Sequence, residues 1–267
     1  MNRVLILVRH SLRRSRGFLA AAYLLMFGFQ WLMILVARQL EEANRFEQLG
    51  GLMPSFISQW TNMVAASFRG FVLFGYSHPV VLIFLVALAI SIGSEPAGEI
   101  ESKFVDILMT RPLRRGAAIA RTLIVLVIAI AGAVTSMFIG TWCGLKVFAP
   151  AAAIVPDTRT ILGLAVNLAL VVLAWGAIAL VAASFAKRRA TVTATCGLLA
   201  LTLFVLDYVG RFWNPAKGIS RVSPFHYFSP FAMIGGSPLP VKDVAVLVAT
   251  TVVCSVVATL VYTRRDL

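Results

Sequence analysis

Long apolar stretches, separated by shorter polar connections, run along the whole chain. A bilayer core about 30 Å thick is crossed by roughly 20 apolar residues of α-helix. Six stretches match that requirement, at residues 17–37, 71–93, 122–145, 161–186, 190–209 and 244–262. The pattern therefore predicts an all-α integral membrane protein, built as a bundle of six transmembrane helices.

The first 16 residues carry a different pattern, in which apolar and basic positions fall on opposite sides of a helix. With 3.6 residues per turn, Val4, Val8 and Leu12 share one face, and Arg9 and Arg13 lie across from it. Such a helix lies along the bilayer surface with its arginines toward lipid phosphates. We predict a cytoplasmic interfacial helix over residues 1–16, followed by the six-span domain over residues 17–267.

Between the second and third stretches, residues 94–121 predict a short amphipathic helix. Ser94 and Pro96 are typical of a helix start, and Arg111-Pro112 ends the helix. The helix has an apolar face, formed by Ile100, Phe104, Ile107 and Leu108. Its charged face is formed by Glu99, Lys103 and Asp106. The basic residues Arg114, Arg115 and Arg121 then return the chain to the membrane. We predict a helix parallel to the membrane, held between two spans.

Composition agrees with this organisation and excludes other classes of protein. The chain is 60% hydrophobic and 13% charged, whereas a typical soluble domain is about 25% charged. This balance rules out a disordered chain and an ordinary water-soluble enzyme.

The formal net charge of +13 is distributed unevenly over the predicted loops. More than half of the 24 Lys and Arg residues lie on one side of the bundle, in residues 1–16, 94–121, 187–189 and 263–267. The positive-inside rule places that side, with both termini, in the cytoplasm. The basic excess is thus an orientation signal whose partners are membrane lipids, and we predict no binding to nucleic acid.

Catalytic motifs are missing from the sequence. It has no Gly-x-x-x-x-Gly-Lys-Ser/Thr phosphate loop, no Gly-x-Ser-x-Gly elbow and no His-Glu-x-x-His pair. Cys143, Cys196 and Cys254 lie inside predicted spans without paired spacing, and the three histidines are scattered. We therefore predict that the chain is not an enzyme and holds no metal or cofactor of its own. If ATP drives it, another polypeptide must hydrolyse the ATP.

Two features concern the side opposite the cytoplasm. Asp207 is an ionisable residue within the fifth span, and Arg211, one turn later, is its predicted structural ion-pair partner. The loop over residues 210–243 is rich in proline and aromatic residues, so we expect it to dip into the bilayer or to cap the bundle. With a single carboxyl in the spans, a proton relay is not predicted, and an external energy source is favoured.

Several segments resemble those of a known family, the transmembrane permease subunits of type-2 ABC exporters. The resemblance is carried by the basic N-terminal helix, by the segment Gly98-Glu99-Ile100-Glu101-Ser102-Lys103-Phe104-Val105-Asp106-Ile107-Leu108-Met109-Thr110-Arg111-Pro112-Leu113, by Ser223-Pro224-Phe225-His226-Tyr227-Phe228 and by the ending Tyr262-Thr263-Arg264-Arg265-Asp266-Leu267. Together with the order of the spans, these segments cover the whole chain. The sequence departs from the family at Lys103 and Phe104, where Gly-Thr is common.

The resemblance implies an ATP-driven exporter in a prokaryotic inner (plasma) membrane. Two copies of this chain, or one copy with a sister chain, would pair with two cytosolic nucleotide-binding ATPase subunits, which bind ATP and Mg. Residues 99–111 would form the coupling helix, with docking contacts from Glu99, Glu101, Lys103, Asp106 and Arg111, and with Ile100, Phe104 and Leu108 holding it against the bundle. The outer gate would comprise Ser223, Pro224, Phe225, His226 and Tyr227.

Other functions share some of these sequence features. The chain could be the membrane subunit of an ABC complex that serves assembly or maturation of an extracytoplasmic enzyme, instead of drug or lipid export. A channel or membrane enzyme that acts without ATP is a third reading. The aromatic residues Phe27, Phe29, Trp31 and Phe74 favour a hydrophobic or amphiphilic cargo for an exporter.

Overall fold

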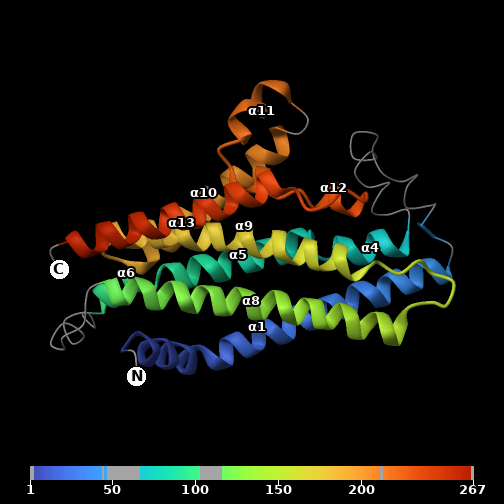
Figure 1. Ribbon diagram of the computed structural model, residues 1–267, viewed down its shortest axis with the longest axis horizontal. Coiled ribbons are helices and arrows are strands. Elements are labelled where there is room, and N and C mark those ends of the chain that lie inside the picture. Colours follow the sequence, from blue (N-terminus) through green and yellow to red (C-terminus); the bar gives the residue numbers. More distant parts are fainter. Residues whose placement is uncertain (1–2, 44, 47–66, 103–115, 211–212, 266–267) are drawn as a thin grey trace.

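The computed structural model of the protein describes residues 3–43, 45–46, 67–102, 116–210 and 213–265. All regular elements within these ranges are helical, and the long helices lie side by side in an elongated bundle (Figure 1). In chain order they are α1 (Arg3–Glu42), α4 (Phe68–Phe74), α5 (Pro79–Gly93), α6 (Glu95–Glu101), α8 (Gly116–Phe148), α9 (Thr158–Phe185), α10 (Arg189–Gly210), α11 (Asn214–Ser220), the 3-10 helix η1 (Pro224–Tyr227), α12 (Pro230–Ile234) and α13 (Val241–Arg264).

Six helical segments in the described residues are long and apolar enough to cross a membrane, α4 and α5 being taken together. They cover Val4–Glu42, Phe68–Gly93, Gly116–Phe148, Thr158–Phe185, Arg189–Gly210 and Val241–Arg264. Each predicted stretch lies inside one of these segments to within one residue. The chain is therefore an all-α protein with the features of a multi-pass membrane protein, as its hydrophobic pattern predicts.

The second span is interrupted where the sequence places a proline inside an apolar run. α4 ends at Phe74, and α5 begins at Pro79, which needs no backbone N–H in the first helical turn. His78 precedes it as the N-cap, and its Nδ1 accepts a hydrogen bond from the backbone N–H of Val80 at 3.3 Å. The interruption follows from the Pro79 ring, since a proline inside a continuous helix breaks a hydrogen bond and clashes.

The N-terminal helix differs from the expectation of a separate element over residues 1–16. α1 is one helix of 40 residues with no break near residue 17. At 1.5 Å per residue it is about 60 Å long, roughly twice the bilayer core. Its sequence offers no proline or paired turn residues to interrupt it between the amphipathic part and the apolar part. The basic segment is thus a rigid extension of the first span.

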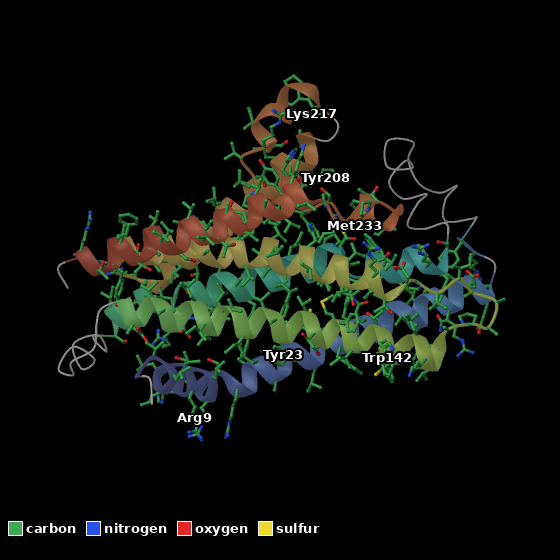
Figure 2. The ribbon with its side chains drawn as sticks, viewed as in Figure 1. Arg9, Tyr23, Trp142, Tyr208, Lys217 and Met233 are labelled. Carbon is green, nitrogen blue, oxygen red and sulfur yellow. The ribbon has the colours of Figure 1, made fainter. Side chains whose placement is uncertain are left out.

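α1 packs along α8 through a row of small residues. Gly132, Ser136, Gly140 and Gly144 follow at four-residue intervals, which places them on one face of α8. The Ser136 hydroxyl donates to the carbonyl oxygen of Tyr23 at 2.6 Å, and a Cβ added at Gly140 would lie 2.8 Å from the carbonyl oxygen of Phe27. The two backbones therefore touch, as in small-xxx-small helix pairs of membrane proteins. Figure 2 shows Tyr23 at this contact.

α9 forms the centre of the bundle, and α10 and α13 form its periphery. Trp175, in the middle of α9, is completely buried, whereas Leu198 on α10 and Val253 on α13 are at least 60% exposed. α5 reaches α9 at Gly93, where an added Cβ would collide with the carbonyl oxygen of Gly176. Exposed apolar faces on two peripheral helices are what a bilayer solvent requires.

The two ends of the bundle differ in what they hold. Both termini and α6 lie together at one end (Figure 1), where residues 186–188 link α9 to α10. We call this the basic end. At the opposite end lie α4, α12 and the link over residues 149–157. There Lys146 stands 3.6 Å from the ring centroid of Trp142, which is half-exposed, a pairing typical of a membrane interface.

Candidate functional site at the basic end of the bundle

α6 directly follows the second span at the basic end. Ser94 ends α5 and precedes α6, and Pro96 occupies the first turn of the new helix, where a proline is tolerated. The Ser94 side chain is completely buried, and its hydroxyl donates to the carbonyl oxygen of Ser91 at 2.8 Å. Ser94 has a helical backbone conformation and its N–H donates to the carbonyl oxygen of Ile90, so α6 continues directly from the end of α5.

Arg121, in the first turns of α8, joins α6 to the third span. Its side chain is only 4% exposed, and it forms an ion pair with Glu99 and a longer one, at 3.7 Å, with Glu95. It also donates to the hydroxyl of Thr122 at 3.1 Å. A buried guanidinium is stable only when its charge is compensated, so these two carboxylates are a condition for Arg121 to lie here.

Glu95 has an unusual electrostatic environment for a carboxyl group near a helix start. Burial raises the pKa of Glu95 above its ordinary value, the charge of Arg121 acts to lower it, and the negative charge of Glu99 raises it further. Arg189 and Arg14 lower it by smaller contributions. A carboxyl group in this position favours a proton or a cationic partner.

Arg189, the first residue of α10, joins α6 to the fifth span. Its guanidinium donates to the carbonyl oxygen of Ser91 at 2.9 Å and to the hydroxyl of Ser94 at 3.2 Å, and its backbone N–H donates to Glu101 at 2.9 Å. The side chain crosses Gly98 so closely that an added Cβ would lie 3.1 Å from the Arg189 Cδ. α6 is thus tied to two spans that are distant in sequence.

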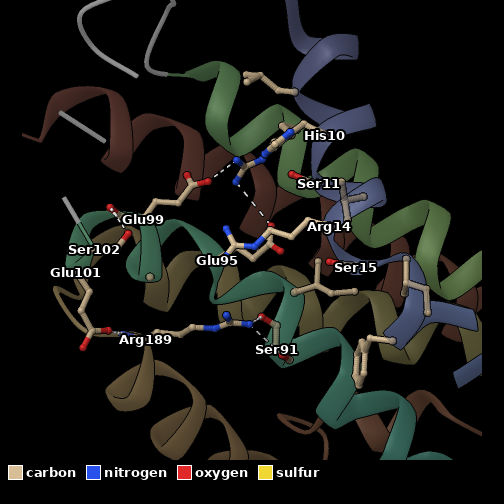
Figure 3. A pocket seen from close by; sticks show the side chains of 17 residues that line it. His10, Ser11, Arg14, Ser15, Ser91, Glu95, Glu99, Glu101, Ser102 and Arg189 are labelled. Atoms are coloured by element: carbon tan, nitrogen blue, oxygen red, sulfur yellow. Dashed lines mark hydrogen bonds and ion pairs between the residues drawn. The ribbon is translucent and has the colours of Figure 1, made fainter. Parts of the chain in front are cut away.

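A cavity of about 470 Å³ opens beside this network, between α1 and α6. Figure 3 shows His10 and Arg14 of α1 on one side and Glu95 and Glu99 of α6 on the other. Its apolar lining comes from α1, α5 and α8, through Leu7, Phe18, Leu19, Ile92 and Val125. The cavity is large enough for a small ligand or a lipid headgroup.

Three of the predicted coupling residues belong to the described part of the chain. Glu99 and Glu101 are held by Arg121 and Arg189, and Ile100 packs against a cluster of buried residues from α8, α9 and α13. Lys103, Phe104, Asp106, Leu108 and Arg111 lie outside the described residues. The docking of an ATPase on this segment stays a prediction.

The predicted gate residues form a compact turn against the middle of α9 and α10. The Phe225 side chain is 4% exposed, with its ring centroid 5.3 Å from that of Trp175 and 5.5 Å from that of Phe204. The completely buried Ser223 donates to the carbonyl oxygen of Leu203 at 3.1 Å and accepts the backbone N–H of Phe225. Pro224 starts η1, and the Tyr227 hydroxyl donates to the carbonyl oxygen of Arg221. The turn therefore packs on the bundle, and Ser223 bonds both to α10 and to the backbone of the turn itself.

The predicted partner of Asp207 lies outside the described residues, since Arg211 is not among them. Within the described residues, Asp207 Oδ1 lies 3.4 Å from Nδ1 of His226. His226 Nδ1 is also 3.3 Å from the hydroxyl of Ser220. The fifth span and η1 thus meet at a polar contact that the sequence does not predict.

Possible metal ligands and the aromatic residues suggested for cargo were also located in the structure. Across the part of the chain that the structure describes, no three His, Cys, Asp or Glu side chains are grouped to hold a metal ion. The rings suggested for cargo pack on each other or on neighbours, Phe27 on Trp31, Trp31 on Phe148, and Phe29 and Phe74 on His78. They act as packing residues in this conformation.

The pairing roles of Glu95, Arg121 and Arg189 are not apparent from the sequence. Arg121 and Arg189 counted there only as basic residues that set orientation. The available signal was the pair Glu95 and Glu99, four residues apart on one helix face and close to an arginine at the start of the next span.

The fold and this network define a polytopic helical membrane protein with a charged intramolecular junction at its basic end. The chain matches no protein-family model and no curated protein sequence.

Proposed function

We propose that this chain is the transmembrane permease subunit of an ABC exporter of the type-2 class, driven by a separate cytosolic ATPase subunit. The cargo in this proposal is hydrophobic or amphiphilic. The proposal includes an inner-membrane location with cytoplasmic termini and a second permease copy across the complex, most simply a homodimer.

The observation that carries the proposal is the attachment of α6. This short helix lies at the basic end immediately after the second span, and Arg121 and Arg189 join it to the third and fifth spans. A force applied to such a helix from the cytoplasm moves several spans together, because packed helices shift as rigid bodies. A subunit without an ATPase motif needs a device of this kind to receive work from a partner.

Differential binding explains how the coupling would produce transport. Closure of the ATPase pair on ATP would favour one arrangement of α6 and its spans over another, and cargo moves only if its affinity differs between the two arrangements. The segment around Phe225, which enters the bundle beside α9 and α10, is the proposed gate.

Copurification tests the proposal. The chain is purified from its native membrane in mild detergent, and its partners are identified by mass spectrometry. We expect a soluble subunit with a phosphate loop and ATPase activity. The double variant Glu101→Ala/Asp106→Ala is expected to weaken its retention at least about tenfold, as expected when interface contacts worth about 1.4 kcal/mol are lost.

The control is the double variant Glu41→Ala/Glu42→Ala, which removes two carboxylates at the other end of α1. It is expected to retain the ATPase fully. Full activity of the chain without any nucleotide-hydrolysing partner would refute the proposal. ATP hydrolysis without cargo movement in liposomes would instead favour a role in assembly of an extracytoplasmic enzyme.

A further inference from the structure

The cavity at the basic end has charges of both signs in balance. Among the described residues, three arginines and three glutamates line it, namely Arg14, Arg121, Arg189, Glu95, Glu99 and Glu101. A ligand with net charge would upset this balance in a partly buried site, whereas a zwitterion would leave it unchanged.

The carboxylates and the exposed cationic groups lie on different walls of the cavity. The three glutamates lie on α6, and Arg14 lies with His10 on α1 (Figure 3). Arg14 and His10 are exposed, whereas Arg121 and Arg189 already make ion pairs or hydrogen bonds inside the protein. The α1 wall is therefore the one that offers cationic groups to a ligand.

The α6 wall offers unfilled acceptor capacity. Glu99 pairs with Arg121 through Oε1, and its Oε2 is buried without a hydrogen-bond donor among the described residues. Glu95 lies 3.7 Å from Arg121, beyond hydrogen-bond distance. Burial raises the pKa of Glu95, so this carboxylate is stabilised by a cationic neighbour. A primary ammonium group supplies three donors for such a wall.

An apolar surface continues from the charged walls to the outside of the bundle. Leu7, Phe18 and Leu19 line the cavity on α1, and Phe18 is 56% exposed. A ligand with a hydrocarbon tail could therefore place its head in the cavity and its tail along the exterior of α1. Free polar molecules would leave this surface unused.

We propose that the cavity binds the headgroup of a zwitterionic phospholipid that carries a primary ammonium group. The ammonium lies against Glu95 and Glu99, and the phosphate lies toward Arg14 and His10. The site does not depend on ATP-driven transport, so it stands or falls separately from the function proposed above.

Native mass spectrometry of the detergent-purified chain tests lipid selectivity. Phosphatidylethanolamine, phosphatidylcholine and phosphatidylglycerol with identical acyl chains are compared. We expect the first to bind at least about tenfold more tightly, because a quaternary ammonium cannot donate hydrogen bonds and phosphatidylglycerol lacks the cation. Equal retention of the three lipids would overturn the proposal. The proposal would also be overturned if free glycerophosphoethanolamine bound as tightly as the whole lipid, because the ligand would then be a soluble molecule.

Two variants locate the site. Arg14→Gln and Glu95→Gln are each expected to lower phosphatidylethanolamine affinity about tenfold, the loss of one charge-assisted contact. Arg9→Gln is the matched control, since Arg9 is exposed on the same helix and points away from the bundle (Figure 2). Equal losses in Arg9→Gln and Arg14→Gln would show a general attraction of α1 for lipid and refute the site.

Discussion

The basic end and the proline-rich segment over residues 220–234 are held in the bundle by opposite means. At the basic end, charged side chains of α6, α8 and α10 meet across elements far apart in sequence. In the proline-rich segment, an aromatic side chain fills a space between α9 and α10, and a serine satisfies the turn backbone. Both regions connect helices, the first mainly through charged pairs and the second mainly through aromatic contacts, which lie beside the contact of His226 with Asp207.

This difference determines which changes in its surroundings each region responds to. A network of buried charges responds strongly to loss of one member, to protonation and to a charged ligand, because each charge is stable only with its partners. An aromatic contact responds to volume and hardly to pH or salt. Under the proposed function, the basic end would be the part of the molecule that receives a chemical or mechanical signal, and the segment around Phe225 would open or close.

The largest expected effect tests this contrast directly. Arg121→Met removes the shared cation and leaves Glu95 and Glu99 without their partner in a buried site. Breaking a buried pair in this way costs about 3–5 kcal/mol of stability. The midpoint of unfolding in detergent measures it. The loss should shrink at acidic pH, since protonation relieves the stranded carboxylates.

A compensating variant separates charge from packing at the same position. Arg121→Met combined with Glu95→Gln and Glu99→Gln removes all three charges, and we expect it to recover most of the lost stability. If the triple variant does not recover stability, Arg121 acts through packing and not through charge. The two regions would then be held in the bundle by the same means.

The sequence predicts the helical framework better than it predicts these contacts. Stretches such as residues 122–145 and 190–209 are recognisable because the bilayer requires a long apolar helix, a local property of the chain. The start of α5 at Pro79 is also local, since it follows from the proline ring.

The charged network escapes sequence reading because it depends on how helices pack. Nothing in the spacing of Glu99 and Arg121 says that their side chains meet, and Arg189 reaches Ser91 only through contact between the second and fifth spans. The approach of His226 to Asp207 comes from another element, so spacing along the chain does not predict it. The pairing of Asp207 with Arg211 stays a prediction, because Arg211 lies outside the described residues. The continuity of α1 is a similar case, because the composition changes near residue 17 but no proline ends the helix there.

A smaller effect is expected in the proline-rich segment. Phe225→Leu keeps an apolar side chain but loses ring contacts with Trp175 and Phe204, at an expected cost of about 1 kcal/mol. The matched control is Tyr227→Phe, which removes only an exposed hydroxyl that donates to Arg221. Unfolding in detergent at two pH values measures both variants. A loss in Phe225→Leu that depends on pH as strongly as that of Arg121→Met would contradict the apolar character of this contact.

The last prediction concerns the opposite end of the bundle, where Asp157 lies in solvent and the contribution of charge alone is the smallest. Asp157 caps α9 by accepting the backbone N–H of Thr160 at 3.0 Å, and it lies 3.3 Å from Arg69. Hydrogen bonds from Thr160 hold the pKa of Asp157 below its ordinary value, with Arg69 as a minor cause. Since the folded pKa is the lower one, the stabilisation is present above the unfolded pKa and is lost as pH falls through the folded pKa.

Two substitutions at this cap therefore separate hydrogen bonding from charge. Asp157→Ala is expected to cost about 1 kcal/mol and Asp157→Asn only a few tenths, because asparagine also caps a helix. The unfolding midpoints of the wild type and Asp157→Asn should differ at neutral pH and converge once the pH falls below the folded pKa of Asp157, which lies under the ordinary value of about 3.9. If the two variants lose the same free energy of unfolding, the effect comes from the charge of Asp157 and not from its hydrogen bonds. This exposed position would then resemble the charged network around Arg121.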